Sequence, residues 1–266
     1  MRTQSGVAIS ADGERWFLVN ASPDIGAQMN AFAPLHPRPQ MRQSQIAGVL
    51  LTNGDLDHVL GLILLREGPV LGVYATTAVR ESLCASGIES ILSAFCGVAW
   101  REPSDDFVDL EDANGAPGGL AARAIFLPGT PPPFVKKSDY AAGHSVAYQI
   151  ESRKSGARLL VAPDVSAVTP ELAEALGESD IVLFDGTFWS SDELRQVREG
   201  ARRAEEMGHL PISGGSLDAL RGLPARHKAY FHVNNTNPIL APGSHEREEI
   251  ERAGIIVGYD GLEFDL

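Results

Sequence analysis

Hydrophobic residues along the chain fall into short runs, separated by turns rich in glycine, proline and charged side chains. Short apolar runs between turns are typical of buried strands, whereas apolar residues three and four positions apart are typical of helices that pack on a sheet. This pattern predicts strands at residues 7–10, 15–20, 46–51, 70–74, 121–127, 145–151, 158–161, 181–185, 228–232 and 255–259. It predicts helices at residues 59–66, 77–84, 170–176 and 246–253. Because strands alternate with helices, the pattern favours an α/β fold with two sheet halves.

The segment that follows the strand predicted at residues 46–51 carries the strongest chemical signal. Asp55, Asp57 and His58 stand between this strand and the apolar run 59–65. Two carboxylates and an imidazole at the end of a strand can converge on one metal ion. A helix cap would explain one aspartate, but not all three residues together. The segment is therefore interpreted as a metal-binding loop.

Three further polar residues follow predicted strands, namely Asp164, Asp185 and His232. Taken singly, an aspartate after a proline is usually a turn residue, and a histidine after a strand is usually a core residue. Together with the loop at residues 55–58, they indicate a site at the ends of several strands. Residues 128–140, which include three consecutive prolines, are interpreted as an ordered loop over this site or as a mobile lid.

Composition narrows the classes of function. The chain has 266 residues, of which 44% are hydrophobic and 21% charged, which is enough to bury a full core as a single domain over residues 1–266. Its net charge of −13, from 35 acidic and 22 basic residues, argues against nucleic acid as a partner. No apolar run is long enough to span a membrane and no secretory signal is recognisable, so we expect a cytoplasmic protein without membrane insertion. Cys84 and Cys96 are interpreted as core thiols.

Five segments resemble, in the same order, blocks of the metallo-β-lactamase superfamily and, within it, of the coenzyme PQQ synthesis protein B family. They are residues 20–25, 51–58, 184–187, 207–209 and 232–238. The resemblance spans nearly the whole chain and implies the superfamily's αββα sandwich, in which two mixed sheets pack face to face between helices.

The departures from the superfamily pattern define the metal site that the resemblance implies. Asn53 and Asp55 stand where the superfamily has the first two histidines of its metal loop, and Thr130 stands where it has a third. The other metal position keeps its set, for which the resemblance implies the ligands Asp57, His58 and His232. Asp164 matches the bridging carboxylate. Two histidines and one carboxylate with open coordination positions are characteristic of Fe(II) oxygenases rather than of two-zinc hydrolases.

The resemblance implies a role in pyrroloquinoline quinone (PQQ) biosynthesis. The expected reaction is an iron- and O2-dependent hydroxylation of the tyrosine ring of a Glu-Tyr-derived PQQ precursor, with Fe(II) as cofactor and zinc as a possible replacement in vitro. The catalytic residues implied beside the metal are Asp55, Asp164 and His209, and the residues implied in binding the cofactor or precursor are Asp24, Lys136, Lys137, Asn234 and Asn235. Arg2 and Arg42 are further candidate cations for the carboxylates of the precursor, although all these cations could equally be solvated surface residues. Asp24 and Asp185 could orient ligands or could be turn residues.

Two other classes of function stay open. One is a two-metal hydrolase of a lactone, thioester or phosphodiester, and the other is a carrier that binds PQQ or its precursor for transport towards the periplasm. A homodimer is a possible assembly. The family begins with a glycine-rich turn and a cysteine-rich segment that precede the position of Met1. Either the start codon is set too late or the chain is a shortened homologue, and in both cases we expect no structural zinc and an exposed sheet edge.

Overall fold

The strands of the protein form two sheets, as seen in a computed structural model that describes residues 2–37, 44–68, 70–136 and 139–266. The five-stranded sheet has the order β1-β2-β3-β4-β5 and consists of β1 (Val7–Ile9), β2 (Trp16–Val19), β3 (Ile46–Leu50), β4 (Leu71–Tyr74) and β5 (Val98–Arg101). The seven-stranded sheet has the order β12-β11-β10-β9-β8-β7-β6. It consists of β6 (Val108–Glu111), β7 (Pro117–Leu127), β8 (Ser145–Ser152), β9 (Arg158–Ala162), β10 (Ile181–Asp185), β11 (His227–Phe231) and β12 (Ile256–Val257).

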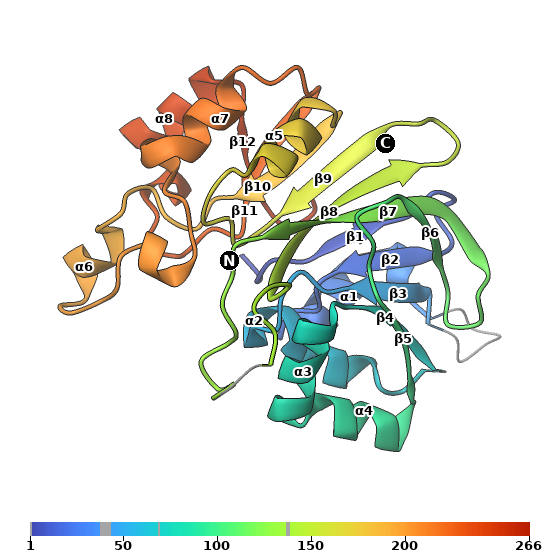
Figure 1. The fold of residues 1–266 in the computed structure, drawn as a ribbon. Coiled ribbons are helices and arrows are strands. Elements are labelled where there is room, and N and C mark those ends of the chain that lie inside the picture. Colours follow the sequence, from blue (N-terminus) through green and yellow to red (C-terminus); the bar gives the residue numbers. More distant parts are fainter. Residues whose placement is uncertain (1, 38–43, 69, 137–138) are drawn as a thin grey trace.

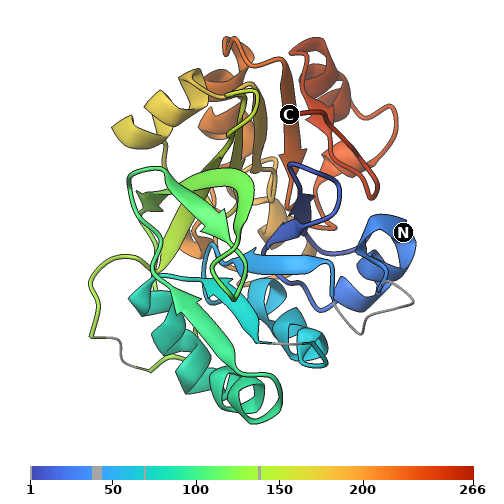
Figure 2. The ribbon, with the colours of Figure 1, turned by 90° about the vertical axis from the view of Figure 1, so that its right-hand side faces the viewer.

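Helices cover the outer faces of both sheets (Figure 1). The five-stranded sheet is covered by α1 (Ile25–Ala31), α2 (Leu56–Val59), α3 (Thr77–Ser86) and α4 (Ile88–Phe95). The seven-stranded sheet is covered by α5 (Pro170–Gly177), α7 (Leu217–Arg221) and α8 (His245–Arg252). The short helix α6 (Glu193–Val197) projects at one end of the molecule, and Figure 2 shows the layers from the side. The αββα sandwich expected from the sequence is confirmed.

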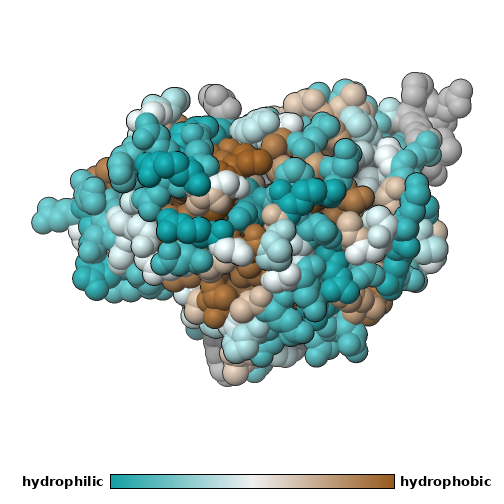
Figure 3. All heavy atoms as spheres, turned by 90° about the horizontal axis from the view of Figure 1, so that it is seen from above, coloured by the Kyte–Doolittle hydropathy of each residue, from teal (hydrophilic) through white to brown (hydrophobic). Residues whose placement is uncertain are grey.

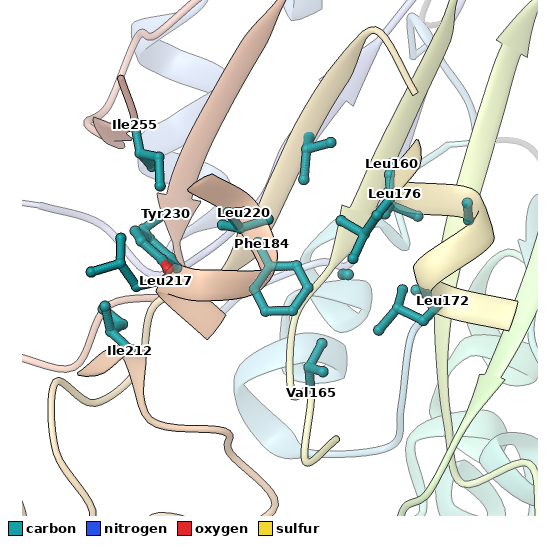
Figure 4. Packing of buried hydrophobic residues seen from close by; sticks show 14 of the residues in the cluster. Leu160, Val165, Leu172, Leu176, Phe184, Ile212, Leu217, Leu220, Tyr230 and Ile255 are labelled. Atoms are coloured by element: carbon teal, nitrogen blue, oxygen red, sulfur yellow. The ribbon is translucent and has the colours of Figure 1, made fainter. Parts of the chain in front are cut away.

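Three apolar layers hold the sandwich together. The layer between the sheets includes Phe17, Tyr148 and Val161, each at most 1% exposed. A second layer lies between the seven-stranded sheet and its helices, where Phe184 and Tyr230 of the sheet face Leu172 and Leu217 (Figure 4). A third lies between the five-stranded sheet and α3 and α4. Because the central strands are buried on both faces, they appear in the sequence as nearly continuous apolar runs.

Strand direction determines where the polar loops meet. Strands β2 to β5 run parallel to one another, and so do β9 to β12, whereas β1 and β8 run antiparallel to β2 and β9. The carboxyl ends of parallel strands lie at one edge of a sheet, which is where α/β folds place their ligands. The polar residues after β2, β3, β9, β10 and β11 therefore gather at neighbouring edges of the two sheets.

The helix predicted at residues 59–66 is wrong in type and position. The chain forms α2 over Leu56–Val59 and then a 3-10 helix over Leu60–Leu65. The reason is a close backbone contact: the amide of Gly61 donates to the carbonyl of Ala21 at 2.9 Å, and a Cβ at Gly61 would lie 2.1 Å from the Ser22 carbonyl oxygen. The pattern also failed to predict β5 and β6, two short edge strands, and the helices α1, α4, α6 and α7.

The cysteines are not both core thiols. Cys84 is exposed and Cys96 is half-buried. Partial burial, together with a hydrogen bond to the carboxylate of Glu89, raises the pKa of the Cys84 thiol to about 11. The prediction failed because Cys84 lies on the outer side of α3, which packs on the sheet through other positions such as Val79 and Leu83.

The outer surface is consistent with the acidic composition. The face seen in Figure 3 is mostly hydrophilic, with apolar atoms in small patches between polar side chains. Within the described ranges, no helix has both the length and the apolar character needed to cross a membrane.

Candidate metal centre

Three predicted metal ligands meet at the edge where the two sheets adjoin. Asp57 and His58 lie in α2, directly after β3, and His232 directly follows β11. The Nε2 atoms of His58 and His232 are 3.0 Å apart, and Oδ2 of Asp57 lies 3.8 Å from the first and 3.4 Å from the second. The prediction combined the neighbours Asp57 and His58 with His232, which is 174 positions from His58 in the sequence. The structure brings the three side chains together.

The size of this triangle fits a metal ion. A triangle with sides of 3.0, 3.4 and 3.8 Å has a centre about 2 Å from each corner, and bonds from imidazole nitrogen or carboxylate oxygen to Zn²⁺ are ~2.0–2.2 Å long. Two Nε2 atoms at 3.0 Å also require a proton or a cation between them, because two lone pairs would otherwise face each other. The donor set therefore suits a divalent metal bound on one face.

Hydrogen bonds at the far side of each ring direct the Nε2 lone pair towards this centre. Thr52 Oγ1 lies 3.2 Å from Nδ1 of His58. The hydroxyl proton of Thr52 points to Oδ1 of Asn20, at 3.2 Å, so the oxygen accepts from the ring and the proton of His58 sits on Nδ1. This leaves Nε2 of His58 free to bind a metal.

His232 is oriented in the same way by a second threonine. Thr187 Oγ1 donates to Oδ1 of Asp185 at 2.6 Å, and it lies 2.9 Å from Nδ1 of His232. The hydroxyl therefore accepts the Nδ1 proton, so in the neutral ring the lone pair of His232 lies on Nε2. Gly186 permits this arrangement, because a Cβ there would lie 2.8 Å from Cβ of Tyr230 and hold β10 and β11 apart.

Asp164 and His209 complete the centre on the other side of His232. Asp164 Oδ2 is 3.5 Å from Nε2 of His58, and Oδ1 is 3.9 Å from Nε2 of His232 and 3.7 Å from Nε2 of His209. Nδ1 of His209 donates to Oδ2 of the buried Asp185 at 2.8 Å. Asp164, His209 and His232 form a second group whose donor atoms all lie within 4.8 Å of one another. Asp185 is thus an orienting residue, not merely a turn residue.

Burial and charge shift the pKa values of the centre in different directions. Burial raises the pKa of Asp55 to about 6, with help from the negative charges of Asp164 and Asp57. Burial lowers the pKa of His58. Burial also opposes the charged form of His232, but the carboxylates of Asp164, Asp185 and Asp57 outweigh it and raise the pKa well above its ordinary value.

His209 and the two remaining carboxylates follow the same logic. Burial disfavours a charged His209, but the charge of Asp185 and its hydrogen bond overcome this effect and raise the pKa of the imidazole. Burial likewise opposes ionisation of Asp57 and Asp185, and the neighbouring histidines hold the pKa of each carboxyl well below its usual range. The centre therefore contains ionised carboxylates beside imidazoles that carry exchangeable protons.

Backbone strain is concentrated at the centre. Within the described ranges, the non-glycine residues with a left-handed backbone are Asn20 (φ 64°), Asp164 (φ 51°) and His232 (φ 55°), and each directly follows a strand or its terminal turn at this edge. Such conformations cost about 1–3 kcal/mol each and persist only where the surroundings enforce them. These three residues are in place because hydrogen bonds from neighbouring loops hold them there.

Two of the three positions that lack the superfamily's histidines, Asn53 and Asp55, take part in hydrogen bonds instead. Nδ2 of Asn53 donates to Oδ2 of Asp164 at 3.0 Å, and Oδ1 of Asn53 accepts from the amide of Asp55 at 3.0 Å. Thr130 is exposed in the loop after β7. This loop approaches the centre, since Pro128 accepts from Ser166 Oγ at 3.1 Å, two residues after Asp164.

The remaining predicted residues lie outside the ligand triangle. Among the described residues, the hydrogen bonds of Asp24 are to Gln4 and within its own turn, and those of Asn234 are to Thr187, Thr236 and Asn237. Asn235 and Lys136 are exposed. Arg2 donates to the carbonyl of Gly258. Lys137 and Arg42 lie outside the described residues.

Sequence reasoning missed the residues that orient the ligands. Thr52 and Thr187 look like ordinary strand-end threonines, although they lie in the segments 51–58 and 184–187 that resemble blocks of the family. Asn237 is 2% exposed, and its amide donates to the carbonyls of Gly186 and Thr187 at 2.9 and 3.3 Å. It ties the loop after β11 to the loop after β10. Its position in the polar run 234–237 was the only available signal.

Comparison with known proteins places this centre in a family. A family model described as "Beta-lactamase superfamily domain" matches residues 15–233. Coenzyme PQQ synthesis protein B of Rhizobium meliloti is 40% identical over 271 residues, which cover 100% of this chain and 86% of the relative. The protein of the same name from Methylobacterium nodulans is also 40% identical, with 100% and 88% covered.

Solved structures agree with the sequence relatives. The crystal structure of Zn(2+)-bound PqqB from Methylobacterium extorquens matches with a TM-score of 0.87 and 35% identity, and covers 100% of this chain and 88% of that one. A diphosphatase from the PhnP family matches with a TM-score of 0.66 at 17% identity, covering 98% and 83%, which shows a shared fold alone. Full-length similarity at these levels, together with the matching superfamily domain, shows that the chain belongs to the coenzyme PQQ synthesis protein B family of the metallo-β-lactamase superfamily.

Proposed function

We propose that this protein acts in PQQ biosynthesis in the cytoplasm, as an iron- and O2-dependent hydroxylase of the tyrosine ring of a Glu-Tyr-derived precursor. The names of its relatives support the pathway. The observation that carries the chemistry is the triangle of Asp57, His58 and His232, which offers one carboxylate and two imidazoles on one side of a single ion. When bound there, Fe(II) would supply the activation of O2, for which a facial set of these three ligands is typical.

The protein's own residues would hold the ion and manage protons. Thr52 and Thr187 keep the two imidazoles in the tautomer that offers Nε2. Asp55, with its pKa raised to about 6, lies beside this set and can take up or release a proton near neutral pH. His209, held by Asp185 and protonated more readily than an ordinary histidine, can donate a proton from Nε2 on the side of Asp164. A phenol undergoing hydroxylation must exchange protons, and we assign this exchange to these two groups.

A second candidate is a two-metal hydrolase, favoured by the group of Asp164, His209 and His232. In this reading a second ion would share His232 with the first, and the pair would activate water. Asp164 lies 3.7 and 3.9 Å from the two imidazoles, compared with 3.4 and 3.8 Å for Asp57 in the first triangle, so the two groups are similar in size. Asn53 and Thr130 provide no imidazole at the position where the superfamily binds its other metal. The mononuclear reading is therefore preferred.

The test is a single-turnover assay. The protein would be loaded with Fe(II) under anaerobic conditions, mixed with a Glu-Tyr-derived precursor and exposed to O2, and the product would be analysed by mass spectrometry. Hydroxylation predicts that the product gains oxygen atoms derived from O2, and that H232A and zinc-loaded protein give none. Hydrolysis of esters or phosphodiesters by a form with two zinc ions would support the hydrolase. Tight binding of PQQ or the precursor without consumption of O2 would support a carrier.

A further inference from the structure

Glu193 is a buried carboxylate outside the cluster of candidate ligands. It is 6% exposed and stands at the start of α6. Oε1 accepts from Thr236 Oγ1 at 2.5 Å, and Oε2 accepts from the amide of Trp189 at 2.6 Å. Trp189 belongs to the loop after β10 and Thr236 to the loop after β11. The carboxylate therefore joins the two loops that carry Thr187 and His232.

Further hydrogen bonds connect Glu193 with the candidate metal centre. Since the hydroxyl of Thr236 donates to Glu193, its oxygen accepts from Nδ2 of Asn234, at 2.7 Å. The amide of Asn234 in turn donates to the carbonyl of Thr187 at 3.1 Å. Thr187 is the residue whose hydroxyl accepts from Nδ1 of His232. Hydrogen bonds, joined through the covalent chain of Asn234 and of Thr187, thus connect Glu193 with the ring of a candidate metal ligand.

The loop after β11 needs this support because of its backbone. His232 has φ 55°, a left-handed conformation that a histidine adopts only when its surroundings enforce it. Asn237 ties the far end of the same loop to Gly186 and Thr187. Between these two ends, the bond from Thr236 to Glu193 is a charge-assisted contact in a buried position, which makes it stronger than a neutral hydrogen bond.

We propose that Glu193 is a positioning residue for the metal centre. Through Thr236 and Asn234 it holds the loop of His232 against the loop of Thr187. This keeps Nε2 of His232 close to the donor atoms of His58 and Asp57. This inference rests on the proposed function, because it assumes that the triangle binds a metal. Removing the carboxylate leaves the hydroxyl of Thr236 and the amide of Trp189 without their acceptor and frees the loop to relax. A metal site tolerates only about 0.5 Å of such movement before binding weakens.

The test measures metal binding by the purified full-length chain with Co²⁺ as the probe. E193A should weaken Co²⁺ affinity about 10-fold, the lower end of the range for residues that support metal ligands, and should change the ligand-field absorption bands. E193Q retains one acceptor oxygen and should give an intermediate affinity. T236V should match E193A, and the double variant should be no weaker than either single one, because both changes break the same path.

A matched control separates positioning from general stability. Glu151 on β8 is also largely buried, with its side chain 17% exposed, and it pairs with Arg153 in the turn after β8 and with Arg158 on β9, away from the loops that carry the candidate ligands. E151A should lower the melting temperature and leave Co²⁺ affinity and spectrum unchanged. If E193A likewise lowers only the melting temperature, the positioning role of Glu193 is overturned.

The wild-type protein and H232A distinguish this failure from failure of the proposed function. If wild type binds Co²⁺ tightly, H232A does not, and E193A resembles wild type, the metal centre stands and the role of Glu193 is wrong. If wild type itself shows no specific Co²⁺ binding, the proposed function fails and the inference falls with it. Faster amide hydrogen exchange at residues 232–237 in E193A, but not in E151A, would support the role independently of metal.

Discussion

The hydroxyl of Thr187 offers the sharpest test of how the candidate centre is organised, because it contacts both His232 and Asp185 from a position that is 8% exposed. T187V keeps the shape of the side chain and removes this hydroxyl. Nδ1 of His232 then loses its acceptor, and Asp185 Oδ1, 3.7 Å away, is too distant to replace it without movement. The ring is free to place its proton on Nε2, which cannot then bind a metal.

Two magnitudes follow from these contacts. Loss of an orienting partner weakens metal affinity by about 10- to 100-fold, which corresponds to ~1.4–2.7 kcal/mol. Loss of a buried hydrogen bond to the charged Asp185 lowers the free energy of unfolding of the metal-free protein by about 1–3 kcal/mol. In a chain of this size each kcal/mol lowers the melting temperature by ~2–4 °C.

Competition with a chromophoric chelator measures the affinity, and equilibrium denaturation of metal-free protein measures the free energy of unfolding. T187S is the matched control, since it retains the hydroxyl, and its affinity should stay within threefold of wild type. If T187V binds metal as tightly as wild type, the hydroxyl does not set the tautomer of His232 and the reasoning is refuted.

Further predictions concern the ligands, the vacant histidine positions and one surface turn. H58A and H232A should each abolish tight metal binding while circular dichroism stays that of a folded protein, since each variant loses a ligand but little core packing; unchanged metal content in either would contradict the assignment. The metal content measured by elemental analysis should rise from about one ion per chain towards two when Asn53, Asp55 and Thr130 are all replaced by histidine, the residue that the superfamily has at these positions. Although partial burial opposes its charge, Asp12 accepts from the amides of Arg15 and Glu14 at 2.8 Å, and these bonds lower its pKa from 3.8 to about 2. A carboxyl whose pKa is lower in the folded state stabilises the fold above its ordinary pKa and ceases to do so as pH falls through the folded value. D12N should therefore be less stable than wild type at pH 7, by under ~1 kcal/mol because the turn is exposed, and the difference in urea midpoint should vanish between pH 4 and 2; a difference that persists at pH 2 would count against the charge as its cause.

The polar loop at residues 55–58 of the candidate site could be recognised in the sequence because its side chains are contiguous. Asp55, Asp57 and His58 stand within four positions after an apolar run, and the end of a strand fixes where they point. The match of His232 to them came from resemblance to a family, since nothing local in a strand-end histidine reveals its partner. The structure brings it to His58 over a separation of 174 residues.

The orienting residues could not be predicted in this way. Thr52 and Thr187 have strong strand propensity and carry no local sign of a bond to imidazole. Asp185 could be a turn residue or an orienting residue on sequence alone, and only the packing of the loop after α6 against β10, which brings His209 to within 2.8 Å, decides between them. The error at residues 59–66 has the same origin, because the contact of Gly61 with Ala21 is tertiary and leaves no periodic pattern.

The division of the ligand triangle between the two sheets has a consequence for the lifetime of the folded state. Asp57 and His58 follow β3 of the five-stranded sheet and His232 follows β11 of the seven-stranded sheet, so the triangle exists only after the sheets have docked. A metal that binds there adds its free energy to the native state and not to species in which the sheets are separate. Such late contacts act mainly on the rate of unfolding and little on the rate of folding. The bound ion would therefore slow unfolding and lengthen the time for which the two halves of the sandwich remain together.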